Sequence, residues 1–270
     1  MNNKKESTKF ANEIRKLSLK MVYNAKASHI GGALSMTDIL AVLYSSIIHV
    51  DPNNSKNKER DRFLLSKGHA CTSLYATLAL KGFFPVDELE TYGKDGSRLL
   101  SHTSHHIPGV EISAGSLGHT LPVSCGLALA AKRKNAKWET YCLVSDGELD
   151  EGSNWESILF APQHKLDNLT LIVDYNKIQS LGNTNEVMML EPLKSKFEAF
   201  NWDVVEINGH DHEEIFNAFR KGKTKGRPKV IIANTIKGKG VSFMEDKLLW
   251  HYKSPSEEQF EQAIKEITKS

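Results

Sequence analysis

Short, mostly apolar runs that alternate with segments of helical spacing constrain the fold of this chain more than any other feature. The runs span residues 141–144, 169–173, 204–207 and 230–233, and helices are expected over 155–161, 193–200 and 212–220. Strands that are apolar on both faces are typical of parallel sheets, because helices then cover both sides of the sheet. The pattern therefore predicts an α/β fold with a mostly parallel sheet covered by helices on both faces.

The rest of the chain adds elements around this sheet. Apolar residues recur every three or four positions from Phe10 to Ala25, which predicts an amphipathic helix over about residues 8–27. Further helices are expected over 37–48, 117–132 and 256–270, and a buried strand over 62–66. Residues 89–116 lack a regular period, and so long an irregular segment is usually functional or disordered. No shift in composition divides the chain, so residues 1–270 are predicted to form a single domain.

Composition excludes several classes of protein. The chain has 40% hydrophobic and 25% charged residues, as an ordinary globular protein does. Its 35 basic and 33 acidic residues leave a formal charge of +2, so a nucleic-acid partner is not expected. Three cysteines without C-x-x-C spacing favour the reducing cytoplasm over a disulfide framework or a zinc ribbon. No stretch approaches eighteen apolar residues, and no signal-like segment opens the chain, so neither export nor membrane insertion is expected.

Polar residues follow two of the predicted strands at the edge where parallel sheets bind ligands. Ser145-Asp146-Gly147-Glu148 follows one strand, and Asp174-Tyr175-Asn176 follows the next. Asp146 and Asn176 are 30 residues apart, about one strand-helix-strand unit, so both can reach one crevice. A carboxylate, an amide oxygen and a main-chain carbonyl would suit Mg²⁺, while Gly147 and a following helix start would favour a diphosphate. Asp-Gly after a strand is also common turn chemistry, which leaves an ordinary loop as the alternative.

These strand ends resemble the Gly-Asp-Gly…Asn motif of thiamine diphosphate enzymes, and further motifs resemble transketolases. The matching runs, in the same order, are Lys26-Ala27-Ser28-His29, residues 60–69, Gly115-Ser116-Leu117-Gly118, Val173-Asp174-Tyr175-Asn176-Lys177 and Lys237-Gly238-Lys239-Gly240. The resemblance covers nearly the whole chain. It implies a thiamine diphosphate-binding fold, and specifically the diphosphate-binding half of a transketolase that is encoded as a separate N-terminal subunit.

The resemblance also assigns roles to residues. It implies that Asp146, Asn176 and the Ile178 carbonyl hold a divalent cation, Mg²⁺ or alternatively Ca²⁺ or Mn²⁺. The residues implied to bind thiamine diphosphate are His69, Gly115, Ser116, Leu117, Gly147, Asn176 and His251, with Gly115, Ser116 and Leu117 at its ring end.

Histidines are the implied catalytic groups, because ketol transfer moves protons on and off sugar hydroxyls and carbonyls near neutral pH. His29 and His251 would face the sugar, and His102 resembles the histidine near the donor hydroxyls, with His105 and His106 as alternatives in the same loop. Taken alone, a histidine is more often a packed or solvated residue than a catalyst. Glu151 and Glu156 resemble acidic residues that link paired active sites across an interface between subunits.

Some positions depart from the family pattern. Ser145 replaces the first glycine of Gly-Asp-Gly, and a positive φ at that position would make the serine weaken cation binding. Ser101-His102-Thr103 replaces Gly-His-Pro in the loop that bears on donor specificity, and Gly118-His119-Thr120 replaces Gly-Gln-Gly. Gly222-Lys223-Thr224 lacks the first glycine of a P-loop, and no histidine spacing supports zinc.

The implied function is transfer of a two-carbon ketol unit between ketose and aldose sugar phosphates. In the family, the acid that contacts the aminopyrimidine of the cofactor lies in a second, pyrimidine-binding domain. A chain of 270 residues has no room for that domain, so we expect an α2β2 assembly with a separate C-terminal subunit. The alternatives are a related synthase or branched-sugar-pathway transketolase with another donor, and a non-catalytic scaffold subunit of the same fold.

Overall fold

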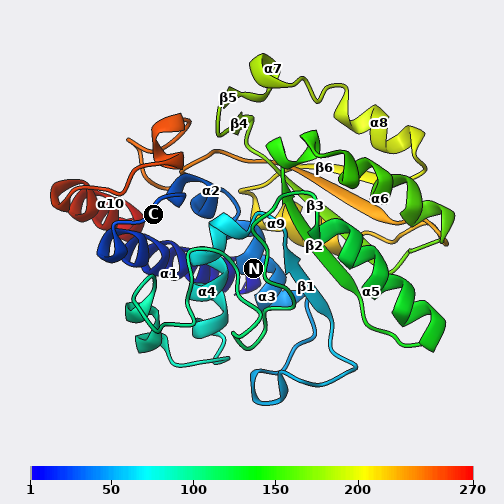
Figure 1. Ribbon diagram of the computed structural model, residues 1–270, viewed down its shortest axis with the longest axis horizontal. Helices are drawn as coiled ribbons and strands as arrows, with labels where there is room; N and C mark the ends of the chain where they lie inside the picture. Colours follow the sequence, from blue (N-terminus) through cyan, green and yellow to red (C-terminus); the bar gives the residue numbers. More distant parts are fainter. Residues whose placement is uncertain (1, 270) are drawn as a thin grey trace.

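A five-stranded, wholly parallel sheet forms the centre of the computed structural model, which describes residues 2–269 (Figure 1). In spatial order the strands are β1 (Arg62–Leu65), β2 (Thr140–Ser145), β3 (Leu169–Tyr175), β7 (Lys229–Asn234) and β6 (Asp203–Asn208). The predicted parallel sheet is confirmed, and each expected apolar run lies in a strand. Met1 and Ser270, which the predicted domain and terminal helix include, lie outside the described residues.

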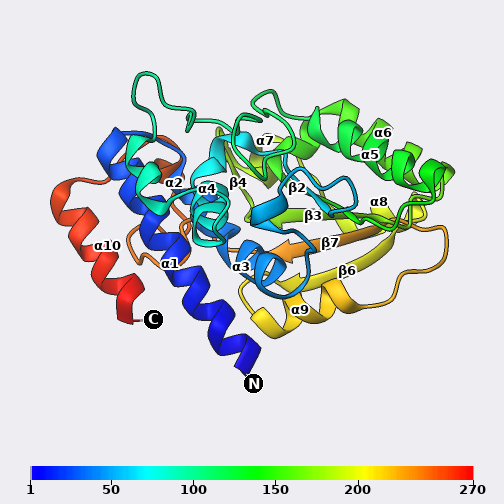
Figure 2. The same ribbon diagram turned by 90° about the horizontal axis from the view of Figure 1, so that it is seen from below.

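Helices cover both faces of the sheet, as expected (Figure 2). One face carries α1 (Asn2–Ala25), α3 (Thr37–Ser46), α4 (Cys71–Leu80) and α9 (His212–Arg220), and the other carries α5 (Thr120–Lys134), α6 (Gly152–Gln163) and α8 (Leu193–Ala199). Alternate residues of each strand enter opposite cores. On β2, Tyr141 and Leu143 pack in the first core, and Cys142 and Val144 pack in the second.

A third apolar cluster joins the N-terminal helix to the end of the chain. It packs α1 against α2 (Ile30–Ser35), the 3₁₀ helix Leu248–His251 and α10 (Glu257–Lys269). Trp250 and Leu19 of α1 are both buried members of this cluster. The cluster brings His29, which precedes α2, and His251 to one place, although they are far apart in sequence.

Several elements were not expected from the sequence. They are α2, α4, the short α7 (Thr184–Val187), the hairpin β4 (Ile178–Gln179) with β5 (Gly182–Asn183), and the 3₁₀ helices Pro52–Asn54, Gly68–Ala70, Val86–Thr91, Gly147–Asp150 and Leu248–His251. Helix α4 is buried along nearly its whole length, so it has no polar face to create an amphipathic pattern. The irregular segment 89–116 contains one isolated bridge, between Thr103 and Ala114.

Helical structure follows Asp146 at once. The residues Gly147–Asp150 form a 3₁₀ turn, and α6 begins at Gly152, three residues before the helix predicted over 155–161. Among the described residues, no helix is long and apolar enough to cross a membrane.

Candidate functional site

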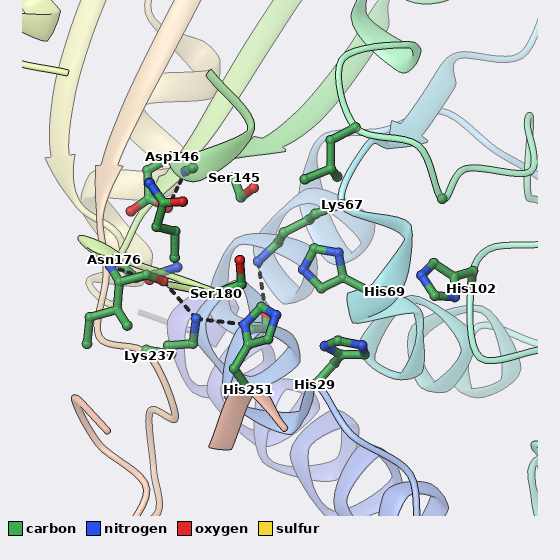
Figure 3. Close-up of a pocket in the computed structure, with 16 residues that line it drawn as sticks. His29, Lys67, His69, His102, Ser145, Asp146, Asn176, Ser180, Lys237 and His251 are labelled. Carbon is green, nitrogen blue, oxygen red and sulfur yellow. Dashed lines mark hydrogen bonds between the residues drawn. The ribbon is translucent and has the colours of Figure 1, made fainter. Parts of the chain in front are cut away.

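An open pocket of about 200 Å³ lies at the carboxyl ends of β1, β2 and β3 (Figure 3). Of the residues predicted to form a site, those that line it are His29, His69, His102, Gly115, Leu117, Asp146, Gly147, Asn176, Ile178 and His251. Residues from several separate segments of the chain thus meet in one place. Gly32, Lys67, Ser145, Gln179, Ser180 and Lys237 also line the pocket but were not predicted as site residues.

The register of the sheet explains why Asp146 and Asn176 converge. Ser145 at the end of β2 pairs with Asp174 of β3, so the next residues of both strands emerge side by side. Asp146 is 1% exposed, and its carboxylate accepts hydrogen bonds from the Gly147 and Lys177 amides at 2.7 and 2.5 Å. Asn176 is also buried, and its side-chain oxygen accepts from the Ile178 amide at 3.2 Å.

The Asp146 carboxylate lacks full compensation for its charge. Burial, and next the nearby Asp174 carboxylate, raise its pKa to about 6. Within the described residues, no group of three or more His, Cys, Asp or Glu is arranged to hold a metal ion. A cation held by Asp146, Asn176 and the Ile178 carbonyl would have one carboxylate oxygen, one amide oxygen and one main-chain oxygen as ligands, a donor set that suits Mg²⁺.

The Ile178 carbonyl faces a positive charge inside the pocket. Lys237 is 3% exposed, and its ammonium donates to this carbonyl oxygen at 2.7 Å and lies 3.2 Å from His251 Nδ1. Burial lowers the Lys237 pKa to about 8 against the opposing attraction of Asp146. The Asp146 carboxylate is only partly compensated, and the Ile178 carbonyl already accepts from an ammonium group. Because both face the same cavity, these residues fit a bound cation.

A buried ion pair between Lys67 and Asp174 lies beneath the floor of the pocket. Asp174 is fully buried, and its carboxylate accepts from the ammonium of Lys67 and from the Ser35 and Thr235 hydroxyls. Burial would raise the Asp174 pKa, but Lys67, by its charge and its hydrogen bond, holds it below the usual value. Lys67 also donates to the Gly32 carbonyl at 2.7 Å. The network fixes Lys67 where β1 ends.

The motifs that match the family include Lys67, Asp174 and Lys237, but the sequence assigned these residues no role in the site. One signal was available, since charged residues that interrupt or directly follow buried apolar strands need a partner. Asp174 interrupts the apolar run of β3, and Lys67 follows the end of β1. Their pairing was not visible, because it joins residues 107 positions apart.

Four histidines surround the mouth of the pocket. The ring centre of His29 lies 5.0 Å from that of His69, 4.9 Å from that of His251 and 6.2 Å from that of His102. The His29 amide donates to the His251 carbonyl at 3.0 Å, which ties the two segments together. His29 Nδ1 is buried without a hydrogen-bond partner. A buried ring nitrogen without a partner suits a hydrogen bond with the hydroxyl group of a bound ligand.

Burial keeps these imidazoles neutral. It lowers the pKa of His29 to about 4, with a further contribution from His102. Burial, and next the charge of Lys237, lower the pKa of His251 to about 3, and burial together with Lys67 lowers that of His69 well below its usual value. Each ring can therefore accept one hydrogen bond and donate another at neutral pH.

Glu148 organises the loop that carries Gly115 and Leu117. Its buried carboxylate accepts from the Ser66 hydroxyl, from the Gly118 amide at 2.9 Å and from the Ser145 amide at 3.3 Å. Burial raises the Glu148 pKa. Ser116, in the same loop, is exposed and does not line the pocket.

Two backbone details bear on the sequence expectations. Ser145 does not have a positive φ, so serine at this position carries no strain of that kind. A Cβ at position 147 would lie 2.6 Å from the Gln179 Cβ, so glycine there allows the hairpin β4–β5 to approach. The close approach at Gly147 is thus to Gln179 of the protein itself.

The alternatives to His102 lie elsewhere. His105 and His106 do not line the pocket, and their rings pack against each other with centres 4.1 Å apart. His105 also contacts the Ser113 hydroxyl at 2.8 Å. Glu151 and Glu156 are exposed at the start of α6, outside the pocket, so their proposed interface role stays a prediction.

This fold and site define an α/β protein with a polar pocket at the carboxyl edge of a parallel sheet, where proteins of this architecture bind ligands. The chain belongs to the family of transketolase thiamine diphosphate binding domains, which it matches over residues 6–267. The prediction of a thiamine diphosphate-binding, transketolase-type transferase is thereby confirmed, and the alternatives of another donor chemistry or a scaffold are not favoured.

The relatives include separately encoded subunits and also longer enzymes. The chain is 45% identical over 255 residues to an apulose-4-phosphate transketolase subunit of Phocaeicola vulgatus, covering 94% of this chain and 91% of that one. It is 43% identical over 261 residues to a 6-deoxy-6-sulfo-D-fructose transketolase subunit of a Clostridium species, covering 96% and 95%. The transketolase structure from Campylobacter jejuni superimposes with a TM-score of 0.93 at 34% identity, over 98% of this chain but 43% of that one.

Proposed function

We propose that this chain is the cofactor-binding subunit of a two-chain transketolase that moves a two-carbon ketol unit from a ketose to an aldose. The observation that carries the proposal is the meeting of Asp146, Asn176 and the Ile178 carbonyl with neutral histidines in one pocket. The relatives named as separate subunits match almost end to end, which supports a chain that works with a partner. The three apolar clusters share the sheet or α1, which supports residues 1–270 as a single domain.

In this proposal, the floor of the pocket anchors the cofactor through a divalent cation. Asp146, Asn176 and the Ile178 carbonyl would hold Mg²⁺, or Ca²⁺ or Mn²⁺ in its place, and the incomplete compensation of the Asp146 charge supports this. When bound, thiamine diphosphate supplies the carbon nucleophile of the reaction. His69, Gly147, Asn176 and His251 would contact its diphosphate side. Gly115, Ser116 and Leu117, which follow one another in the loop supported by Glu148, would contact its ring end.

The histidines at the mouth would handle the substrate. His29, His102 and His251 hold their rings within reach of one another, and burial lowers the pKa of each. A neutral imidazole can accept a proton from a sugar hydroxyl and return it to a carbonyl oxygen. His102, the one of the three loop histidines at the pocket, is proposed to contact the donor hydroxyls.

The proposed substrates are ketose and aldose sugars with an anionic end group. The relatives named above act on apulose 4-phosphate and 6-deoxy-6-sulfo-D-fructose, which carry a phosphate and a sulfonate. For this chain we propose sugar phosphates. A panel of phosphorylated and sulfonated ketose donors, each offered with one common aldose acceptor, would identify the donor.

The partner would cover the open side of the pocket. Exposed apolar side chains lie next to lining residues, with Leu181 76% exposed beside Ser180, and Leu249 and Tyr252 flanking the segment of His251. A separate C-terminal subunit with the pyrimidine-binding domain would bury them, in an α2β2 assembly with Glu151 and Glu156 at the interface. The three cysteines are free and buried, which supports the cytoplasm as the location.

Calorimetric titration of the co-expressed pair with thiamine diphosphate and Mg²⁺ tests the proposal. We expect saturable binding that needs the cation, and ketol transfer by the pair but not by the purified chain alone. Full transfer by the single chain would contradict the two-chain enzyme. No saturable binding by the pair would contradict the cofactor role.

A further inference from the structure

A buried cluster of charged residues lies outside the pocket, between α1, α3 and the start of α9. Asp38, in the first turn of α3, is 5% exposed and accepts hydrogen bonds from three side chains. Arg15 Nη2 donates at 2.5 Å, and the rings of His210 and His212 lie at 2.8 and 3.0 Å from the carboxylate. We propose that Asp38, Arg15 and His210 are positioning residues that hold the loop carrying Lys237 in the cofactor pocket. The inference rests on the proposed function of that pocket.

His210 connects the carboxylate to the loop. Its Nε2 accepts a hydrogen bond from the Ile236 amide at 2.8 Å, so the ring proton must lie on Nδ1, which then donates to Asp38. Both ring nitrogens are used, and the side chain is 11% exposed. His210 therefore fixes the backbone at the residue directly before Lys237.

Arg15 holds the other side of the same loop. Its Nη2 pairs with Asp38, while its Nε donates to the Lys239 carbonyl at 3.2 Å. Backbone groups one residue before and two residues after Lys237 are thus tied to one carboxylate. Burial would raise the Asp38 pKa, but Arg15 and the two histidines hold it well below the usual value, so the carboxylate stays charged.

The placement of Lys237 depends on this loop. The ammonium reaches the Ile178 carbonyl at 2.7 Å, and no ion pair with a carboxylate holds it among the described residues (Figure 3). Gly238 has a φ of 80°, and a Cβ there would lie 2.4 Å from the Met244 carbonyl oxygen, so the turn is tight. Its amide donates to the Gly31 carbonyl at 2.9 Å, which secures the loop on the pocket side. A shift of the loop would therefore withdraw the ammonium from the cavity.

His212 provides a matched control. It contacts the same carboxylate and is 6% exposed, but its other nitrogen lies 2.7 Å from the Ser7 hydroxyl and not from the loop. His210→Phe and His212→Phe each remove one imidazole contact with Asp38 at similar side-chain volume. Only the first also releases the Ile236 amide. His210→Gln offers an oxygen near the place of Nε2 and can still accept from that amide.

The test measures hydrogen exchange of residues 235–240 in the full chain with its partner, without cofactor, and thiamine diphosphate affinity in Mg²⁺. For His210→Phe we expect exchange about tenfold faster and affinity about tenfold weaker, as for the loss of one buried hydrogen bond. His212→Phe should leave both within about twofold even where it lowers the melting temperature, and His210→Gln should recover part of the loss.

Lys237→Met distinguishes the role of the ammonium in cofactor binding from the role of the buried cluster in holding the loop. It should weaken thiamine diphosphate binding without changing exchange in the loop. Equal exchange in the two phenylalanine variants would overturn the proposal, and so would a Lys237→Met protein with unchanged affinity. If the unmodified pair binds no thiamine diphosphate, the proposed function fails, while the exchange comparison still decides whether the cluster holds the loop.

Discussion

The floor and the mouth of the pocket are built in different ways. The floor consists of Asp146 and Asn176, and the pair Lys67–Asp174 lies beneath it. All four residues lie within two residues of strand ends, and their side chains are buried and hydrogen-bonded. The mouth loop, residues 101–116, has one isolated bridge and exposes His105 and Ser116. Positions next to paired strands are set by the sheet, whereas loop positions depend on a few local contacts. The proposed cation ligands Asp146 and Asn176 therefore lie where the paired strands set their positions.

The largest expected effect comes from removing the one carboxylate proposed as a cation ligand. Asp146→Ala should weaken Mg²⁺-dependent binding of thiamine diphosphate by at least about 100-fold, because the charged ligand is lost. Calorimetric titration of the assembled pair measures this. Asp150→Ala, which removes an exposed carboxylate that contacts Gln179, is the control and should bind normally. An unchanged affinity in Asp146→Ala would refute the cation assignment.

The pair beneath the floor should matter for stability. Lys67→Met leaves the fully buried Asp174 without its cation, and breaking such a pair from one side costs about 3–5 kcal/mol. Urea unfolding of the protein should show this loss. Lys67→Met with Asp174→Leu should regain part of it, because an apolar pair leaves no buried charge. A single variant as stable as the unmodified protein would show that this pair does not support the floor.

The neutral histidines predict a pH dependence with a defined sign. Burial lowers the folded-state pKa of His29 to about 4 and that of His251 to about 3, whereas unfolded histidine has a pKa of about 6.5. Between these values the unfolded state binds more protons at the two histidines, so their contribution to stability falls as pH drops below about 6.5, whereas the raised pKa of Asp146 acts in the opposite direction over a narrower range. Urea unfolding from pH 7.5 to 4.5 measures the slope, which should be shallower in His251→Gln. NMR titration of either ring near pH 6.5 would contradict this prediction.

Prediction from sequence succeeded where the signal is local. The five strands of the central sheet were visible because their residues are mostly apolar, and the strand ends pointed to Asp146 and Asn176 because parallel strands end at one edge. Helix α4 was missed because it is buried on all sides, and α2 because six residues are too few for a period. The Lys67–Asp174 pair joins distant residues, and no local pattern reports it.

Prediction from sequence also failed to identify which histidine lies at the mouth of the pocket. His102, His105 and His106 share one aperiodic loop, so spacing could not rank them. In the structure the Tyr75 hydroxyl donates to the His102 carbonyl at 2.6 Å, while His105 bonds to Ser113 away from the pocket. These contacts form only when the loop folds against its neighbours, and the sequence contains no signal for them.

The smallest expected effects concern the mouth. His102→Ala should lower kcat/KM for the donor sugar by about tenfold, the loss expected for one hydrogen bond made to the substrate, while thiamine diphosphate affinity stays within about twofold. His105→Ala should leave both unchanged, because its ring lies outside the pocket. Steady-state kinetics and calorimetry on the assembled pair measure the two quantities. If His102→Ala weakened the cofactor as strongly as Asp146→Ala, the division between a cofactor-holding floor and a substrate-facing mouth would be wrong. If His105→Ala lowered kcat/KM without changing cofactor affinity, the substrate contact would belong to His105 and not to His102. The division between floor and mouth would still hold.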